Sequence, residues 1–363
     1  MSTDKEYMQM ALDLAVKGLG NTSPNPMVGA VIVKDGRIIG KGFHERYGDL
    51  HAERNALRDC TEDPKGATMF VTLEPCCHTG KQPPCTDAVI ASGISKVIVG
   101  SSDPNPEVAG RGIQILREHG IEVIEGFMKE ECDALNYVFF HYITKNVPYV
   151  VMKYAMTIDG KIATYTGLSK WVSCEASRED VQMLRKRYSS IMVGIGTVLA
   201  DDPMLNCRIP GAKQPVRIIC DTNLNIPVES NIVRTARDFK TIIATSSRDE
   251  EKKDELKGSG CQILDIPSYD GLLDLEALMR ELGKMKIDSV LIEGGGTINW
   301  SMVQHGLVDR VVTYIAPKFF GGDAAKSPVE GQGFEEPYQA RNLKIVSMRR
   351  CDTDIVIESE VIR

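Results

Sequence analysis

Short apolar runs alternate with segments of helical periodicity along the first part of the chain. Residues 4–18 carry apolar side chains on one face, which predicts an amphipathic helix. The apolar runs 28–33 and 37–43 flank an Asp-Gly pair, a strong signal for a β-hairpin. A longer helix is expected at 129–142. The next short strands are predicted at residues 69–73, 96–100 and 121–126. This alternation predicts a sheet that helices cover on both faces.

A polar segment that ends in a proline, residues 144–148, separates this part from a second α/β half. In that half, two predicted strands run directly into glycine turns and helices, at residues 191–197 and 289–304. A chain of 363 residues is also long enough for two domains. We therefore expect one domain at 1–146 and another at 147–363.

Two cysteines and a His-Ala-Glu sequence are the strongest candidates for a catalytic site. Cys76 follows a predicted strand and Pro75, and Cys85 begins a predicted helix, so each of these two element ends offers a thiol. His51 and Glu53 begin another helical segment. Zinc-dependent nucleobase deaminases carry H-x-E followed by P-C-x-x-C, and their glutamate moves protons without binding the metal. Eight residues separate the two cysteines here, so the spacing departs from that signature.

One imidazole and two thiolates would leave the fourth position of a zinc ion open, as in catalytic zinc sites. Such a zinc lowers the pKa of its bound water to about 7, and Glu53 would pass the water proton to the leaving amine. A structural zinc with Cys77 or His78 as the fourth ligand is one alternative. Reduced core cysteines beside a surface histidine are another. We favour the catalytic interpretation because Glu53 would have no role in a closed site.

Two polar loops that contain prolines add candidate substrate contacts. Asn25 lies in the first loop, and its amide can both donate and accept, as a pyrimidine edge requires. An Asx turn explains this asparagine equally well. His44 leads into the loop before His51 and could also contact substrate, although a single histidine is more often structural. The second loop, 101–106, follows a strand, and α/β sheets bind ligands beyond the carboxyl ends of their strands.

The glycine turns of the second half predict an anion site. Backbone amides at such turns can approach a phosphate, although tight packing explains the turn at 191–197 equally well. Gly294–Gly296 are harder to explain by packing, because each glycine costs backbone entropy. Neither turn is the G-x-G-x-x-G dinucleotide fingerprint. Ser246 and Arg248, after a strand at 241–245, could hold a ribose phosphate.

Composition limits the classes of function. The net charge is −7 and no dense stripe of basic residues is present, which disfavours the alternative of a deaminase that acts on nucleic acids. No apolar run approaches the ~18 residues of a membrane span, so we expect no membrane partner. Ten cysteines without an export signal indicate reduced thiols and a cytoplasmic location. A third interpretation is a structural zinc module joined to a nucleotide-binding sensor without catalytic activity.

Together these motifs resemble the RibD family of bifunctional riboflavin-biosynthesis proteins over nearly the whole chain. The first half carries NPMVGAVIV, HAE, VTLEPC, GKQPPC and DPNPEVAGRG, and the second carries MTIDGKIAT, SKWVS, VGIGTVLADDP, CDTNL, IEGGGT and IAPKFFGG. The resemblance implies a cytidine-deaminase-like three-layer domain followed by a dihydrofolate-reductase-like domain. It implies zinc-dependent deamination of 2,5-diamino-6-ribosylamino-4(3H)-pyrimidinone 5′-phosphate, and then NADPH-dependent reduction of its ribosyl side chain to ribityl.

The resemblance also implies roles for individual residues. His51, Cys76 and Cys85 would bind zinc, with Glu53 as the proton shuttle. Deaminase substrate contacts would be Asn25, His44, His78, Lys81, Asp103 and Asn105, with Lys81 facing the phosphate. Reductase substrate contacts would be Lys153, Ser169, Arg185, Arg208 and Glu293, with both arginines suited to the phosphate. NADPH would contact Trp171, Thr197, Asp201, Thr245, Ser246, Gly294, Gly295, Gly296 and Thr297.

The sequence also leads to expectations for Cys77, for the reductase mechanism and for the oligomeric state. Cys77 stands where the family usually has serine, and we expect it to be a bystander because its side chain should diverge from that of Cys76. No general acid for the reduction is evident, so catalysis in the second domain would consist mostly of positioning. We expect a homo-oligomer.

Overall fold

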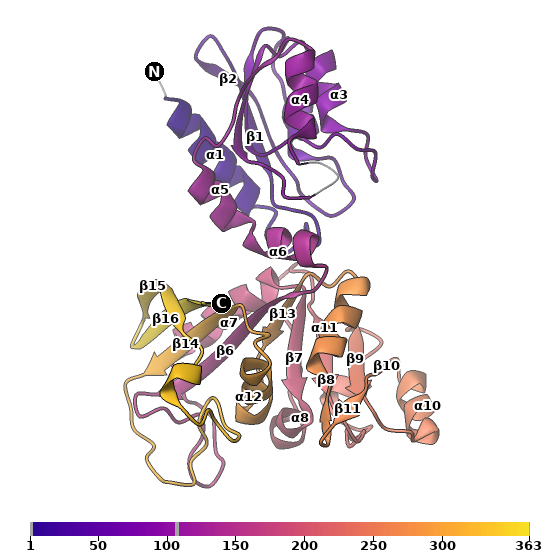
Figure 1. The fold of residues 1–363 in the computed structure, drawn as a ribbon, viewed down its shortest axis with the longest axis vertical. Helices are drawn as coiled ribbons and strands as arrows, with labels where there is room; N and C mark the ends of the chain where they lie inside the picture. The colour runs from indigo at the N-terminus through magenta and orange to yellow at the C-terminus, as the bar shows by residue number, and fades with distance from the viewer. Residues whose placement is uncertain (1–2, 106–108, 363) are drawn as a thin grey trace. The chain divides into compact units, whose positions relative to one another are not determined.

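The structure is a computed structural model that describes residues 3–105 and 109–362. The chain divides into two compact units, Met1–Asn146 and Val147–Arg363 (Figure 1). The predicted polar loop 101–106 and the DPNPEVAGRG motif extend into residues 106–108, which lie outside the described residues. No helix in the described ranges combines the length and hydropathy that a membrane span requires.

The first unit is built on a five-stranded sheet in the order β2-β1-β3-β4-β5. β1 pairs antiparallel with β2 and β3, whereas β3, β4 and β5 are parallel. The predicted hairpin is confirmed, and Asp35 and Gly36 turn it with φ of 48° and 74°, as a type I′ turn requires. The strands are β1 (Gly29–Lys34), β2 (Arg37–Phe43), β3 (Thr68–Leu73), β4 (Lys96–Ser101) and β5 (Glu122–Ile124).

Helices cover both faces of this sheet, which confirms the predicted three-layer architecture. Figure 1 shows α1 and α5 on one side and α3 and α4 on the other. Tyr7 and Met8 of α1 pack with Phe70 and Ile98 in the core of the first side. Ala56 of α2 belongs to the apolar core of the second side. The helices are α1 (Asp4–Val16), α2 (Ala52–Arg58), α3 (Cys85–Ala91), α4 (Arg111–Glu118) and α5 (Lys129–Leu135).

The single helix predicted at 129–142 is wrong, because the structure has α5 and a separate α6 (Tyr137–Lys145). Asn136 lies between them with φ of −114° and ψ of 22°. Its amide donates to the carbonyl oxygen of Met27 and accepts from the N–H of the same residue, both at 2.9 Å. This pair of bonds ties Asn136 to a distant loop, and the helix is interrupted at this residue.

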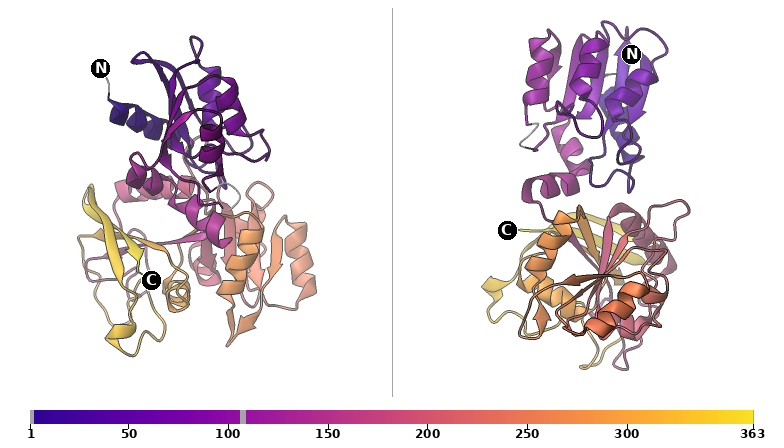
Figure 2. Two further views of the ribbon diagram at one scale, coloured as in Figure 1. Left: turned by 45° about the horizontal axis from the view of Figure 1, so that its top comes forward. Right: turned by 90° about the vertical axis from the view of Figure 1, so that its right-hand side faces the viewer.

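The second unit contains a nine-stranded sheet in the order β10-β9-β8-β7-β13-β6-β14-β16-β15. Figure 2 shows this unit, coloured from magenta to yellow, from two further sides. Seven strands, from β10 to β14 in this order, are parallel, and the hairpin β15-β16 adds two antiparallel strands at one edge. The strands are β6 (Tyr149–Thr157), β7 (Ser190–Gly194), β8 (Val216–Cys220), β9 (Thr241–Thr245), β10 (Gln262–Asp265), β13 (Ser289–Ile292), β14 (Arg310–Ala316), β15 (Leu343–Cys351) and β16 (Asp354–Val361). β11 (Ser268–Tyr269) and β12 (Leu272–Leu273) form a separate hairpin.

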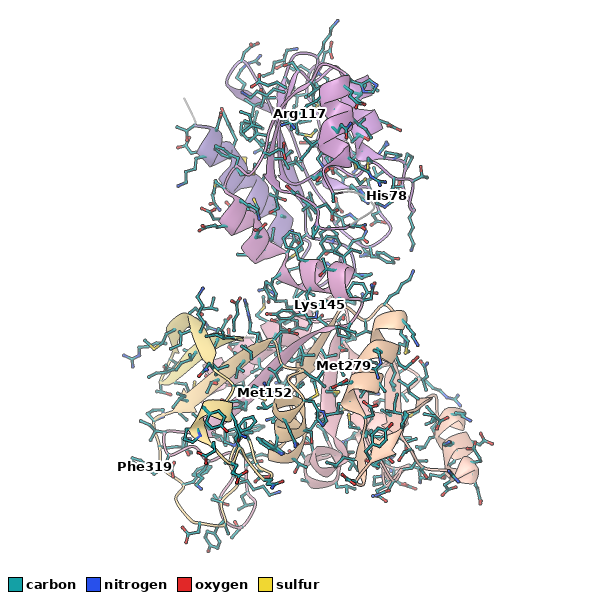
Figure 3. The ribbon with its side chains drawn as sticks, viewed as in Figure 1. His78, Arg117, Lys145, Met152, Met279 and Phe319 are labelled. Atoms are coloured by element: carbon teal, nitrogen blue, oxygen red, sulfur yellow. The ribbon has the colours of Figure 1, made fainter. Side chains whose placement is uncertain are left out.

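Helices cover both faces of the parallel part of the sheet. Met152 of β6 and Met279 of α11 belong to the core of one face, and Figure 3 labels both. Val198 of α8 and Leu256 of α10 belong to the core of the other face. The helices are α7 (Glu175–Arg187), α8 (Ile195–Asp201), α9 (Asn231–Arg234), α10 (Glu250–Gly258), α11 (Leu275–Lys284) and α12 (Gly296–Gln304), and Pro337–Gln339 form a short 3-10 turn. Because parallel strands share one carboxyl edge, the loops after β7, β8 and β13 gather there.

Candidate active sites

His51, Cys76 and Cys85 come together in the first unit. Nδ1 of His51 lies 3.4 Å from the sulfur of Cys76 and 3.4 Å from that of Cys85. The three ligand atoms lie within 4.8 Å of one another, and they form the one such cluster in the described part of the chain. In a tetrahedral zinc site, a nitrogen and a sulfur ligand lie about 3.5 Å apart. The arrangement therefore fits a shared zinc ion.

The backbone around the cluster explains how eight intervening residues are accommodated. The carbonyl oxygen of Cys76 accepts hydrogen bonds from the N–H groups of Cys85 and Thr86, at 3.0 and 3.2 Å. The loop between the cysteines thus closes back on the start of α3. His51 is the N-cap residue of α2, but its side chain makes no capping bond, so the imidazole is free to face the two thiols.

Glu53 is buried beside this cluster in the first turn of α2, with 3% of its surface exposed. Burial and the neighbouring Cys76 raise the pKa of its carboxyl group to about 7. Such a group can both take up and release a proton near neutral pH. Hydrogen bonds from Cys85 and His51 lower the pKa of Cys76 to about 4, whereas the hydrogen bond with Cys76 and burial raise the pKa of Cys85. Without a metal the pair therefore favours one thiolate, at Cys76.

Asn25 and His44 lie next to the cluster and contact each other. Nδ2 of Asn25 is 3.3 Å from Nε2 of His44, and Nδ1 of His44 is 3.1 Å from the carbonyl oxygen of Leu50. The His44 and His51 rings meet edge to face at 5.2 Å. Burial lowers the pKa of His44, so the neutral ring is favoured. Both residues border the cluster, and their contact with substrate stays a prediction.

The remaining predicted deaminase contacts lie on two loops. His78 and Lys81 are exposed on the loop between β3 and α3, where Figure 3 labels His78. The ammonium group of Lys81 lies 4.0 Å from the centre of the Tyr47 ring. Asp103 lies on the loop after β4, and it accepts a 2.9 Å hydrogen bond from the N–H of Asn105. Burial raises the pKa of Asp103 to about 6.

Glu74 fixes the loop that carries Asp103, a role that the sequence analysis missed. One carboxylate oxygen accepts from the N–H groups of Asp103 and Gly110, at 3.2 and 3.1 Å. The other accepts from Gly112 and Ile113, at 3.0 and 3.4 Å. Glu74 is only 3% exposed. A buried carboxylate at a strand end was the available sequence signal, but its backbone partners lie 29 to 39 residues away.

In the second unit, a cavity of about 500 Å³ brings together most of the predicted reductase residues. It lies beyond the carboxyl end of β13, where a ligand site is expected in an α/β sheet, and against the second half of β6. Burial lowers the pKa of its Lys153. The predicted residues in its wall are Lys153, Ser169, Trp171, Arg185, Asp201, Arg208, Glu293, Gly294 and Gly295.

Arg185 and Glu293 form a buried ion pair in this cavity. Nε and Nη2 of Arg185 donate to the two carboxylate oxygens of Glu293, at 2.8 and 3.0 Å. Nη1 donates to the carbonyl oxygen of Asn206 at 2.9 Å. Although burial opposes both charges, their attraction raises the pKa of Arg185 and lowers that of Glu293. Most of the Arg185 guanidinium is thus engaged within the protein.

A neighbouring cavity of about 380 Å³ lies at the ends of β7, β8 and β13. It includes Thr197, Gly295, Gly296 and Thr297 from the predicted cofactor residues. Thr245 and Ser246 are not in its wall. Their hydroxyl groups donate to the carbonyl oxygen of Thr222, at 3.1 and 3.2 Å, and Thr222 itself lines the cavity.

Comparisons with known proteins cover both units. Residues 148–357 match the model of the RibD C-terminal domain, and residues 1–101 match the cytidine and deoxycytidylate deaminase zinc-binding region. The riboflavin biosynthesis protein RibD of Actinobacillus pleuropneumoniae is 53% identical over 360 residues, which covers 99% of this chain and 96% of that protein. The chain belongs to the RibD family.

Other RibD proteins are similar to this chain in sequence and in structure over nearly their full length. RibD of Escherichia coli K12 is 40% identical over 367 residues, covering 98% of each chain. The structure resembles form 1 of Acinetobacter baumannii RibD with a TM-score of 0.90, at 37% identity and 99% coverage of both chains. It resembles the Thermotoga maritima diaminohydroxyphosphoribosylaminopyrimidine deaminase/5-amino-6-(5-phosphoribosylamino)uracil reductase with a TM-score of 0.86, at 38% identity, covering 99% of this chain and 98% of that one.

The structure also places Cys77 and the loop after β8. Cys77 lies outside the His51 cluster as far as the structure describes the chain. In the loop after β8, Asp221, Thr222 and Asn223 line the smaller cavity, a role that was not predicted from the sequence. The polar CDTNL sequence at a strand end was the signal that could have found them.

Proposed function

We propose that residues 1–146 form a zinc-dependent pyrimidine deaminase and residues 147–363 an NADPH-dependent reductase, acting in sequence. The substrate is 2,5-diamino-6-ribosylamino-4(3H)-pyrimidinone 5′-phosphate, and the product is 5-amino-6-(5-phosphoribitylamino)uracil. The description of the Thermotoga maritima relative, which names both activities, supports this order. The observation that carries the proposal is the His51, Cys76 and Cys85 cluster beside the buried Glu53.

In the deaminase, Glu53 moves the protons. Zinc held by His51, Cys76 and Cys85 would supply a water of lowered pKa. The Glu53 carboxylate would accept a proton from that water and return it to the amino group that leaves the ring. Its raised pKa suits both transfers at neutral pH. Asn25, His44, Asp103 and Asn105 would hold the pyrimidine, and His78 and Lys81 would contact the phosphorylated end.

In the reductase, we assign the larger cavity to the phosphorylated substrate and the smaller one to the dinucleotide. Gly295 lines both cavities, so the two ligands can meet there. NADPH, when bound, would supply the hydride. Lys153 is the candidate proton donor that the sequence analysis lacked, because burial lowers its pKa and its side chain lines the substrate cavity. Ser169 and Arg208 would hold the substrate. Thr197, Gly296 and Thr297 in the smaller cavity would contact NADPH. Trp171, Asp201 and Gly294 line only the larger cavity, so they would contact the end of NADPH that reaches past Gly295 toward the substrate.

A two-stage assay tests this function. The diaminopyrimidine substrate is incubated with the protein, first without and then with NADPH, and the products are followed by mass spectrometry. We expect exchange of one amino group for oxygen in the first stage and gain of two hydrogens in the second. A substrate that stays unchanged in both stages contradicts the proposal.

A homo-oligomer is also proposed, joined through β15. This strand lies at the edge of the nine-stranded sheet and pairs on one side with β16. Ile345 and Met348 on β15 are 61% and 69% exposed, which is unusual for a long edge strand. A second copy could pair with this edge. Ile345→Lys with Met348→Lys should convert the oligomer to a monomer in sedimentation analysis, and an unchanged mass would contradict this interface.

The location proposed for the protein is the cytoplasm. All ten cysteines are free, and a reducing compartment preserves free thiols.

A further inference from the structure

One face of α7 lines the larger reductase cavity with a row of polar side chains. Arg178, Gln182 and Arg185 are spaced four and three residues apart, so they share one side of the helix. The Oε1 atom of Gln182 accepts a 2.9 Å hydrogen bond from the N–H of Arg208. This bond fixes the start of the Arg208 side chain next to the same helix face. Three arginines therefore converge on one cavity.

The three arginines differ in how many ion pairs and hydrogen bonds their guanidinium groups make within the protein. Arg185 is engaged by Glu293 and by a backbone carbonyl, as described above. Arg178 donates from Nη1 to the carbonyl oxygen of Ser173 at 2.7 Å, and its guanidinium lies over the Trp171 ring at 4.6 Å. Neither Arg178 nor Arg208 takes part in an ion pair in the described part of the chain. Both retain N–H donors for a ligand.

The charge of the cavity wall matches a phosphate monoester. Its cations are Lys153, Arg178, Arg185 and Arg208, and its anions are Asp201 and Glu293, so four positive minus two negative charges leave +2. A phosphate monoester carries about −1.5 to −2 at neutral pH. Because Arg185 and Glu293 neutralise each other, Arg178 and Arg208 carry much of the excess charge. Arg178 and Arg208 also line an adjoining surface cavity, where Glu175 and Glu179 add negative charge.

We propose that Arg178 is a phosphate ligand of the reductase substrate, acting together with Arg208, and that it makes the reductase selective for phosphorylated substrate. This inference rests on the proposed reductase function. Trp171 stacks on one side of the guanidinium and the Ser173 carbonyl holds its edge, so Arg178 is oriented before the substrate arrives. Such an oriented guanidinium loses less side-chain entropy on binding than a free one.

The kinetic test compares wild type, Arg178→Met and Arg178→Lys with two substrates, the phosphoribosyl compound and its dephosphorylated form. The methionine of Arg178→Met keeps an apolar chain beside the Trp171 ring but carries no charge. Arg178→Met should raise KM for the phosphorylated substrate about 10- to 100-fold, the value expected for a charged hydrogen bond. It should leave KM for the dephosphorylated form and for NADPH nearly unchanged. Arg178→Lys should recover part of the loss. Arg234→Met removes an exposed arginine of α9 outside both cavities and should match wild type.

A binding test is independent of turnover. The chain has two tryptophans, Trp171 and Trp300, and both lie in the reductase unit, so tryptophan fluorescence follows that unit alone. Ribose 5-phosphate should quench this fluorescence at a lower concentration than ribose does, and Arg178→Met should abolish the difference. Equal losses for both substrates, or a raised KM for NADPH alone, would show that Arg178 only supports Trp171. If wild type reduces neither substrate but Arg178→Met still abolishes the ribose 5-phosphate preference, the proposed reductase fails while the phosphate site stands.

Discussion

Replacement of Glu74 by Gln tests how the deaminase loop is held. The wild-type carboxylate is buried and accepts four backbone hydrogen bonds, two on each oxygen. The side-chain amide of Glu74→Gln keeps one acceptor oxygen, but an NH₂ group replaces the other oxygen. That NH₂ group faces two backbone N–H groups and cannot accept hydrogen bonds from them. Two bonds to a charged acceptor are therefore lost, at about 1.5–3 kcal/mol each, or about 3–6 kcal/mol together. For a unit of this size, such a loss lowers the unfolding midpoint on the order of 10 °C.

The assay follows each unit by its own signal. Heating in the presence of a chromogenic chelator reports zinc release from the first unit, whereas tryptophan fluorescence reports the second. Glu74→Gln should lower the temperature of zinc release and raise KM for deamination, because Asp103 and Asn105 lose their anchor. The fluorescence transition and the reductase rate should stay at wild-type values. Glu118→Gln, an exposed glutamate on α4, is the matched control and should change the midpoint little. A Glu74→Gln variant with wild-type zinc release and KM would refute this account of the loop.

Three further predictions address the two sites. Glu53→Ala should keep bound zinc but reduce deamination at least about 100-fold, because the proton carrier is lost. Metal analysis and the deaminase rate measure both effects, and loss of zinc would contradict the role assigned to Glu53. Cys85→Ala should lose zinc and deamination, while reduction of substrate that is already deaminated continues; loss of both activities would contradict independent units. The reductase rate should fall as pH rises through the lowered pKa of Lys153, since the protonated amine that donates exists only below that pKa. The dependence of kcat on alkaline pH, compared between wild type and Lys153→Met, tests whether the rate falls in this direction.

Much of the fold follows from local sequence signals. The Asp-Gly hairpin, the strands that run into glycine turns, and the His-Ala-Glu and cysteine elements are each encoded within a few neighbouring residues. The spacing of apolar residues along a predicted helix or strand shows which of its side chains are buried, and this spacing can be read from the sequence. The deaminase signature joined the two distant halves of the zinc site, and the family resemblance accounted for the long spacing between the cysteines.

The features that the sequence did not reveal depend on distant partners. Asn136 interrupts the predicted helix through Met27, which is 109 residues away. Glu293 pairs with Arg185 across 108 residues, so the arginine expected to hold phosphate is largely engaged. Thr245 and Ser246 turn toward the Thr222 carbonyl instead of a cavity. Local propensity carries no information on such contacts.

The most direct test of the central claim is metal analysis combined with deamination by the purified full-length chain. The account predicts one zinc ion per chain, retained in Glu53→Ala and absent in Cys85→Ala, with deamination only in the zinc-loaded wild type. Full deaminase activity in wild-type protein that contains no transition metal would contradict it.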